Sequence, residues 1–144
     1  MSGGNIMTFY GFRQKKIYNL FISHAWKYDA DYYKVVSWLD NSDIKYKNYS
    51  VPSHDPLDAN NTKKLKEELT GQISPSSVVI VISGMYAAHS EWIDYEIDEA
   101  VRMNKIILGL KPWGSERIPK KIQDYATEMI GWQSKSLIDA IKRY

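Results

Sequence analysis

Histidines, serines and aromatic side chains in three short polar segments are the residues of this sequence that could do chemistry. His24, His54 and His89 lie one in each of the stretches SHAWKYD, PSHDPLDAN and GMYAAHS. Imidazole is a common metal ligand, but no HExxH or similar spacing joins the three histidines, so we expect no metal site. Ser23 directly precedes His24, yet no GxSxG elbow is present, which disfavours a hydrolase triad. Neither GxGxxG nor GxxxxGK(S/T) occurs, so a dinucleotide would not be held in the Rossmann or P-loop manner.

The composition narrows the class of protein further. The 144 residues are 44% hydrophobic and 25% charged, which is ordinary globular usage and enough for one core without disulfides. The net charge of +2 gives no electrostatic argument for a nucleic-acid partner, and the absence of cysteine excludes thiol nucleophiles and cysteine-ligated zinc. No apolar run approaches the ~20 residues of a membrane helix, and the first residues have no apolar signal core. We therefore expect a cytoplasmic protein that does not bind membranes.

Alternating strand-like and helix-like segments must position the three polar segments. Strands are expected at Ile17–Ser23, Ile44–Val51, Ser77–Ser83, Lys105–Leu110 and Glu128–Trp132. Helices are expected at Asp29–Ser42, Asn61–Ile73, Ser90–Asn104, Ile118–Tyr125 and Ser134–Tyr144. This alternation predicts an α/β, flavodoxin-like three-layer fold, with a five-stranded parallel sheet of order 2-1-3-4-5 and helices on both faces. Residues 1–14 are expected to be an N-terminal extension, and residues 15–144 a single domain.

The predicted topology brings the three polar segments together. In such sheets a ligand crevice lies beyond the carboxyl ends of the strands, at the switch point between the first and third strands. Ser23–Asp29 follows the first strand and Gly84–Ser90 is expected to be a loop after the third, while Pro52–Asn60 can lean over the same crevice. Asp29 and Ser90 are predicted N-caps of the helices that follow.

Two of these segments resemble the sequence boxes of TIR domains. The stretch FISH at residues 21–24 resembles their first-strand box, and SGMYAAHSEWIDYE at residues 83–96 resembles their third box, in which a serine, an aromatic residue, a second serine, a tryptophan and a glutamate follow in order. Within this superfamily the chain is most similar to the bacterial TIR-like proteins of antiphage systems such as Thoeris. The RDxxPG pattern of receptor TIR domains is absent, and PSHDPLDAN stands in its place.

The resemblance implies an enzyme that acts on NAD, as an NAD nucleosidase or ADP-ribosyl cyclase. Such domains cleave the bond between nicotinamide and ribose, with NAD as the substrate and no cofactor. They release ADP-ribose, or a cyclised isomer that signals to a separate effector, and they can associate with themselves or with other TIR-like chains. The family's catalytic glutamate matches Glu96.

The residue types suit this chemistry. The transition state is oxocarbenium-like, so a nearby carboxylate lowers its energy. Glu96 lies one helical turn after Trp92 on the same face, in the second turn of a helix that would begin at Ser90 and could direct its N-terminus at a phosphate. Substrate-binding residues are expected to include hydroxyl, imidazole, carboxylate and aromatic groups near the crevice: Ser23, His24, Trp26, Asp55, Tyr86 and Trp92.

Each assignment has a structural alternative. Glu96 could be a carboxylate on the helix surface, Trp92 a packing residue, and Ser23 a partner for the backbone at the strand end. His24 could be a solvated loop residue or a phosphate contact, and Asp55 could belong to turn chemistry alone.

Two further functions remain open beside NAD cleavage. One is a non-catalytic TIR scaffold that binds other TIR domains, which would not need the carboxylate of Glu96. The other is a nucleoside deoxyribosyltransferase-like enzyme, which would share the sheet and a catalytic glutamate. A phospho-receiver domain is set aside because Ser83 stands where an aspartate should end the third strand. The sequence carries no signature that separates hydrolysis from cyclisation.

Overall fold

The computed structural model describes residues 16–23, 30–50, 62–114 and 117–144, with only the backbone described for residues 85–90. Five strands form one sheet in the order β3-β2-β4-β5-β6, and every neighbouring pair is parallel. The strands are β2 (Ile17–Ser23), β3 (Lys45–Asn48), β4 (Val78–Ile82), β5 (Ile106–Leu110) and β6 (Glu128–Ile130). In chain order this is the predicted 2-1-3-4-5 arrangement, so the α/β flavodoxin-like fold is confirmed.

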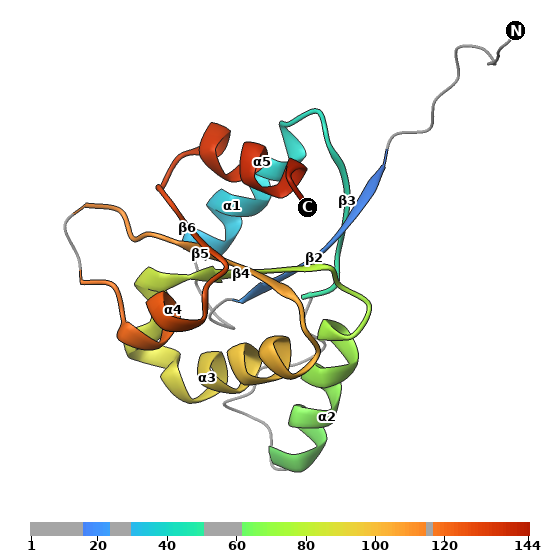
Figure 1. Cartoon of the computed structure of the whole chain (residues 1–144), viewed down its shortest axis with the longest axis vertical. Helices are drawn as coiled ribbons and strands as arrows, with labels where there is room; N and C mark the ends of the chain where they lie inside the picture. Colours follow the sequence, from blue (N-terminus) through green and yellow to red (C-terminus); the bar gives the residue numbers. More distant parts are fainter. Residues whose placement is uncertain (1–15, 24–29, 51–61, 115–116) are drawn as a thin grey trace, which may run out of the picture.

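Helices cover both faces of the sheet and make three layers. The helical elements are α1 (Ala30–Asp40), α2 (Thr62–Ile73), the 3-10 helix η3 (Ser83–Met85), α3 (Tyr86–Arg102), α4 (Lys120–Tyr125) and α5 (Ser134–Lys142). Figure 1 shows α1 and α5 on one face of the sheet and α2, α3 and α4 on the other. None of the helices in the described part of the chain is both long and apolar enough to cross a lipid bilayer.

The position of β4 in the core explains why its sequence is a continuous apolar run. All five residues of β4 (VVIVI) are buried, because helices cover that strand on both faces. On the helices, apolar residues repeat at intervals of three or four and face the sheet, as Leu65, Leu69 and Ile73 do on α2. The edge strand β3 instead alternates between exposed and half-buried side chains, as expected for a strand at the margin of a sheet.

A tryptophan pair joins the elements on the α1 and α5 face. Trp38 of α1 and Trp132, between β6 and α5, have ring centroids 4.8 Å apart and planes inclined by 59°. Both are partly buried against the core. The two rings therefore pack α1 against the carboxyl end of the sheet's last strand.

The start and the end of α3 differ from the sequence prediction. The prediction of a loop at Gly84–Ser90 is wrong, because η3 leads directly into a helix that begins at Tyr86 rather than at Ser90. Two alanines in this first turn favour helix. Ser90 is therefore not the N-cap. The helix ends at Arg102 because Asn104 takes the left-handed conformation, with a φ of 57°.

The other element boundaries shift by a few residues. The second strand ends at Asn48 rather than Val51, because the Asn48 side chain accepts a hydrogen bond from the Ser50 backbone N–H (3.0 Å) and stabilises a turn. Helix α4 begins at Lys120, and Pro119 occupies the N-cap position rather than the first helical one. The predicted N-cap Asp29 and the N-terminal extension lie outside the described residues.

Candidate active site

The candidate site lies at the carboxyl edge of the sheet, where the strand order reverses. Strand β2 lies at the centre of this reversal, since the chain next adds β3 on one side and then β4 on the other. Ser23, the last residue of β2, pairs in register with Val81 of β4, and Ser83 follows two residues after Val81. The carboxyl ends of these adjacent strands form the switch point at which such folds bind ligands.

The side chain of Glu96, on α3, lies at this edge of the sheet. The helix buries the stripe formed by Ile93, Ile97 and Ala100 against the sheet, and Glu96 falls within the same stripe. The side chain is 4% exposed, so the alternative of a surface carboxylate is wrong. Burial raises its pKa to about 8, and an interaction with the Ser23 hydroxyl acts in the opposite direction. At neutral pH the unliganded site therefore holds Glu96 mainly as the neutral acid.

Neighbouring carboxylates on α3 are paired with cations. Asp98 and Asp94 lie 2.8 Å and 3.7 Å from the ammonium group of Lys121 on α4. Among the described residues, no ion pair involves Glu96. A buried carboxyl group with a raised pKa at a ligand-binding edge is a typical signature of a functional residue.

Two serine hydroxyls are buried at the same strand ends. Ser23 is fully buried and Ser83 is 3% exposed. Within the described part of the chain, neither Oγ has a partner at full hydrogen-bonding geometry. The interaction between Ser23 and Glu96 is therefore weak. An unsatisfied buried hydroxyl costs about 1–3 kcal/mol, and buried polar groups in native proteins are seldom left so. The edge thus combines a protonated carboxyl group with two hydroxyls that have hydrogen-bonding capacity to offer a ligand.

The model of the family described as "Thoeris protein ThsB, TIR-like domain" matches residues 21–117, which is more than half of the chain. The chain belongs to this family of TIR-like domains. The match includes the end of β2, the 3-10 helix η3 and helix α3, which carry Ser23, Ser83 and Glu96 respectively. Among curated proteins, no sequence matches this TIR-like domain significantly.

Solved structures include one with a similar fold and very low sequence identity. The structure of Clostridium botulinum CMP N-glycosidase, BcmB, superposes with a TM-score of 0.52 at 12% sequence identity. The match covers 86% of this TIR-like domain and 98% of the glycosidase chain. At that identity the likeness shows a shared fold alone.

The structure brings together only some of the residues that the sequence analysis assigned to the site. Ser23 and Glu96 meet at the carboxyl edge, and Trp92 packs half-buried against the core one turn before Glu96. Tyr86 is the first residue of α3, and only its backbone is described. Three further predicted site residues lie outside the described residues: His24, Trp26 and Asp55.

Ser83 is the residue at this edge that the sequence analysis did not assign to the site. Ser83 is interpreted there as the last residue of a strand, as the first serine of the third TIR box and as evidence against a phospho-receiver domain, but is given no role in binding. Its position in the third TIR box was an available signal for a role in the site. The lack of a hydrogen-bond partner for its hydroxyl depends on side-chain positions, which the sequence does not give. Because α3 begins at Tyr86, Glu96 lies in the third turn of the helix rather than the second.

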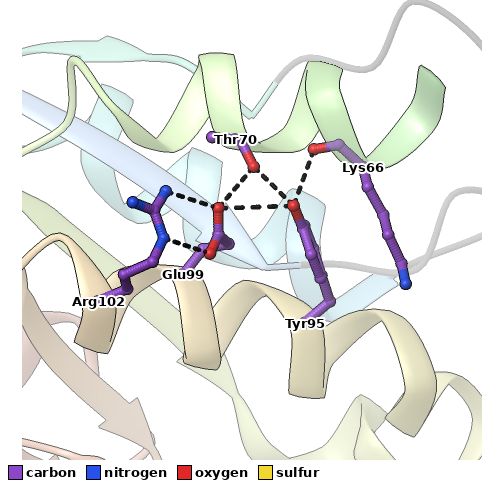
Figure 2. Close-up of polar contacts among 5 residues, drawn as sticks. All are labelled: Lys66, Thr70, Tyr95, Glu99 and Arg102. Atoms are coloured by element: carbon purple, nitrogen blue, oxygen red, sulfur yellow. Dashed lines mark hydrogen bonds and ion pairs between the residues drawn. The ribbon is translucent and has the colours of Figure 1, made fainter. Parts of the chain in front are cut away.

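A second carboxylate on α3, Glu99, has the opposite surroundings. Its Oε1 accepts hydrogen bonds from Thr70 Oγ1 (2.7 Å) and from the Arg102 guanidinium (2.9 Å), while Oε2 accepts one from Arg102 Nε (2.8 Å). The Tyr95 hydroxyl lies 2.6 Å from Thr70 Oγ1 and bonds the Lys66 carbonyl, as Figure 2 shows. The Arg102 hydrogen bond, partly opposed by burial and supported by Thr70 and Tyr95, lowers the pKa of Glu99 to about 2.

This second cluster has the features of a structural contact between helices. It borders an open groove of about 550 Å³ between α2 and α3, lined in part by Lys66, Thr70 and Tyr95. The polar groups of Thr70 and Tyr95 already bond to one another and to the protein. These two hydroxyls are therefore satisfied by the protein itself. Across the described residues, no group of three or more histidines, aspartates or glutamates is arranged to hold a metal ion.

Proposed function

We propose that this TIR-like domain cleaves the bond between nicotinamide and ribose in NAD, with Glu96 as the catalytic carboxylate. The observation that carries the proposal is the burial of Glu96 at the switch point, with its pKa raised to about 8 and no cation paired with it among the described residues. Membership in the Thoeris TIR-like family supports it. The fold shared with a protein named as an N-glycosidase is consistent with chemistry at a glycosidic carbon.

During the reaction, the positive charge would move from the nicotinamide ring to the ribose. The bond from C1′ to the ring nitrogen breaks with both electrons going to nitrogen, which neutralises the ring's positive charge. C1′ then develops oxocarbenium character, which a carboxylate beside it stabilises. A cationic ring entering the site favours the ionised form of Glu96, because an opposite charge in a low-dielectric site lowers a carboxyl pKa.

The nucleophile determines the product. Attack by water at C1′ gives ADP-ribose and a proton, whereas attack by a nucleophile within the substrate gives a cyclised isomer. We propose that the product acts as a signal for a separate effector protein. Self-association or contact with other TIR-like chains would be the means by which activity is controlled.

Turnover of NAD by the purified protein tests the proposal. Wild type and Glu96→Ala are incubated with NAD, and the products are separated by chromatography. We expect nicotinamide release by wild type and none by the variant, and the second product distinguishes hydrolysis from cyclisation. Glu99→Gln is the matched control, because it alters a carboxylate three residues away on the same helix, outside the candidate site.

Three outcomes would contradict the proposal. Equal nicotinamide release by wild type and Glu96→Ala would remove Glu96 from the chemistry. If wild type is inactive both alone and in extracts of phage-infected cells, the scaffold function is favoured instead. Release of a free base from CMP or a deoxynucleoside, with NAD left intact, would favour the nucleoside-transferring alternative.

A further inference from the structure

Ser83 is a buried polar residue that the proposed role of Glu96 leaves unexplained. Its side chain is 3% exposed, and its hydroxyl has no hydrogen-bond partner within the described part of the chain. The same holds for the Ser23 hydroxyl, apart from its weak interaction with Glu96. Native proteins rarely retain such groups without a reason, because a buried unsatisfied hydroxyl destabilises the fold.

The opposite end of the same strand provides a comparison. Ser76 precedes β4 and is also buried, at 2% exposed, but its Oγ donates a hydrogen bond to the Ile73 carbonyl (2.6 Å). Ser83 follows β4 at the carboxyl end, two residues beyond the register partner of Ser23. The satisfied serine thus lies away from the switch point, and the two unsatisfied serines lie at it.

We propose that Ser83 and Ser23 hold the sugar of the substrate by exchanging hydrogen bonds with its hydroxyl groups. This inference rests on the proposed function, because it takes a ribose bound next to Glu96. Ribose hydroxyls and serine hydroxyls each donate and accept, so the two sets are chemically matched. The hydrogen bonds missing from the free protein are then made only in the complex. Sugar binding removes a destabilisation that the free domain carries.

Binding and stability measured together test this inference. Wild type, Ser83→Ala, Ser23→Ala and the control Ser76→Ala are titrated with ADP-ribose by calorimetry, and their melting temperatures are measured without ligand. We expect each of the first two variants to bind ADP-ribose about 3- to 10-fold more weakly, the loss typical of one neutral hydrogen bond. Their melting temperatures should stay level or rise, because each loses an unsatisfied buried group.

Ser76→Ala should behave in the opposite way. It loses a satisfied hydrogen bond far from the switch point, so its melting temperature should fall by about 2–6 °C while its affinity for ADP-ribose stays unchanged. Parallel measurement of nicotinamide release completes the design. A Ser83 variant that cleaves NAD more slowly while melting no lower than wild type would support sugar binding over a structural role.

The results separate this inference from the proposed function. If wild type binds ADP-ribose through Ser83 but releases no nicotinamide from NAD, sugar binding stands and the cleavage proposal fails. If NAD is cleaved and Ser83→Ala binds and cleaves as wild type does, the inference is overturned. A fall in melting temperature with unchanged affinity would also overturn it, since the hydroxyl would then serve the fold, for example by holding a buried water. Failure of wild type to bind ADP-ribose would overturn it as well.

Discussion

Glu96 and Glu99 lie three residues apart on α3, and their surroundings push them in opposite directions. Burial raises the pKa of Glu96 to about 8, with only the Ser23 hydroxyl acting against it. Hydrogen bonds led by that of Arg102 lower the pKa of Glu99 to about 2. Hydrogen bonds to the protein replace the water around Glu99. Glu96 is also removed from water, but few hydrogen bonds to the protein replace it.

The difference shows how one helix can serve the fold and a site at once. The side of α3 that faces α2 carries Tyr95 and Glu99, where every polar group has a partner. The side that faces the sheet carries Glu96, where the partners are missing. Stability explains the first arrangement and does not explain the second, which is the pattern expected when a ligand completes the site.

Replacing Glu96 with glutamine should have the largest effect of the changes on α3. The amide keeps the shape but cannot stabilise developing positive charge, so we expect nicotinamide release to fall by about 100-fold or more. The free energy of unfolding should stay level or rise at pH 8, because an amide has no charge to bury. A variant that keeps more than a tenth of the wild-type rate would show that the charge of Glu96 is dispensable.

The free energy of unfolding should depend on pH through Glu96. The pKa of Glu96 is higher in the folded chain (about 8) than its ordinary value of 4.5. The folded state therefore holds the extra proton between these values, and stability falls as pH rises through this window. The slope for one proton is at most about 1.4 kcal/mol per pH unit. Urea unfolding from pH 5 to pH 8 should show a steeper decline for wild type than for Glu96→Gln, and identical slopes would contradict the raised pKa.

Replacing Glu99 with glutamine should affect stability and spare the reaction. The amide loses its charged hydrogen bonds to Arg102 and weakens the one to Thr70, so we expect a loss of about 1–2 kcal/mol in unfolding free energy at pH 7. Because the folded-state pKa of Glu99 is lowered, its contribution is present above pH 4.5 and is lost as pH falls toward 2. The difference from wild type should shrink over that acid range. A change of more than about threefold in nicotinamide release would mean that the cluster is coupled to the site.

Removing the Tyr95 hydroxyl should have the smallest effect. Tyr95→Phe keeps the ring against α2 but removes its bonds to Thr70 and to the Lys66 carbonyl. A typical neutral hydrogen bond contributes about 0.5–1.5 kcal/mol, and we expect the lower part of this range because Thr70 still bonds Glu99. The urea midpoint at pH 7 measures it. A loss larger than that of Glu99→Gln would show that the tyrosine, rather than the carboxylate, organises the cluster.

Sequence reasoning predicted the sheet order from the alternation of strands and helices, and it predicted the buried stripe of α3 from hydrophobic periodicity. It placed Glu96 at the switch point by combining that stripe with the resemblance to TIR domains. It did not find the Glu99 cluster, although the spacing of Glu99 and Arg102 was an available signal. The bond from Thr70, on another helix, depends on how α2 and α3 pack and could not be read from local spacing. The same limit applied to Ser83, because the lack of a hydrogen-bond partner for its hydroxyl depends on how the side chains around it pack.

The tilted pair of Trp38 and Trp132 should provide an intrinsic spectroscopic signal of folding. Indole rings with centroids 4.8 Å apart couple their electronic transitions, so the pair should contribute a distinct signal in circular dichroism. The pair packs on the α1 and α5 face, across the sheet from the helix that carries Glu96. Loss of this signal during unfolding would follow the integrity of the layers without responding directly to a ligand. The integrity of the layers could thus be followed by circular dichroism, without a label, while ligand binding is measured separately.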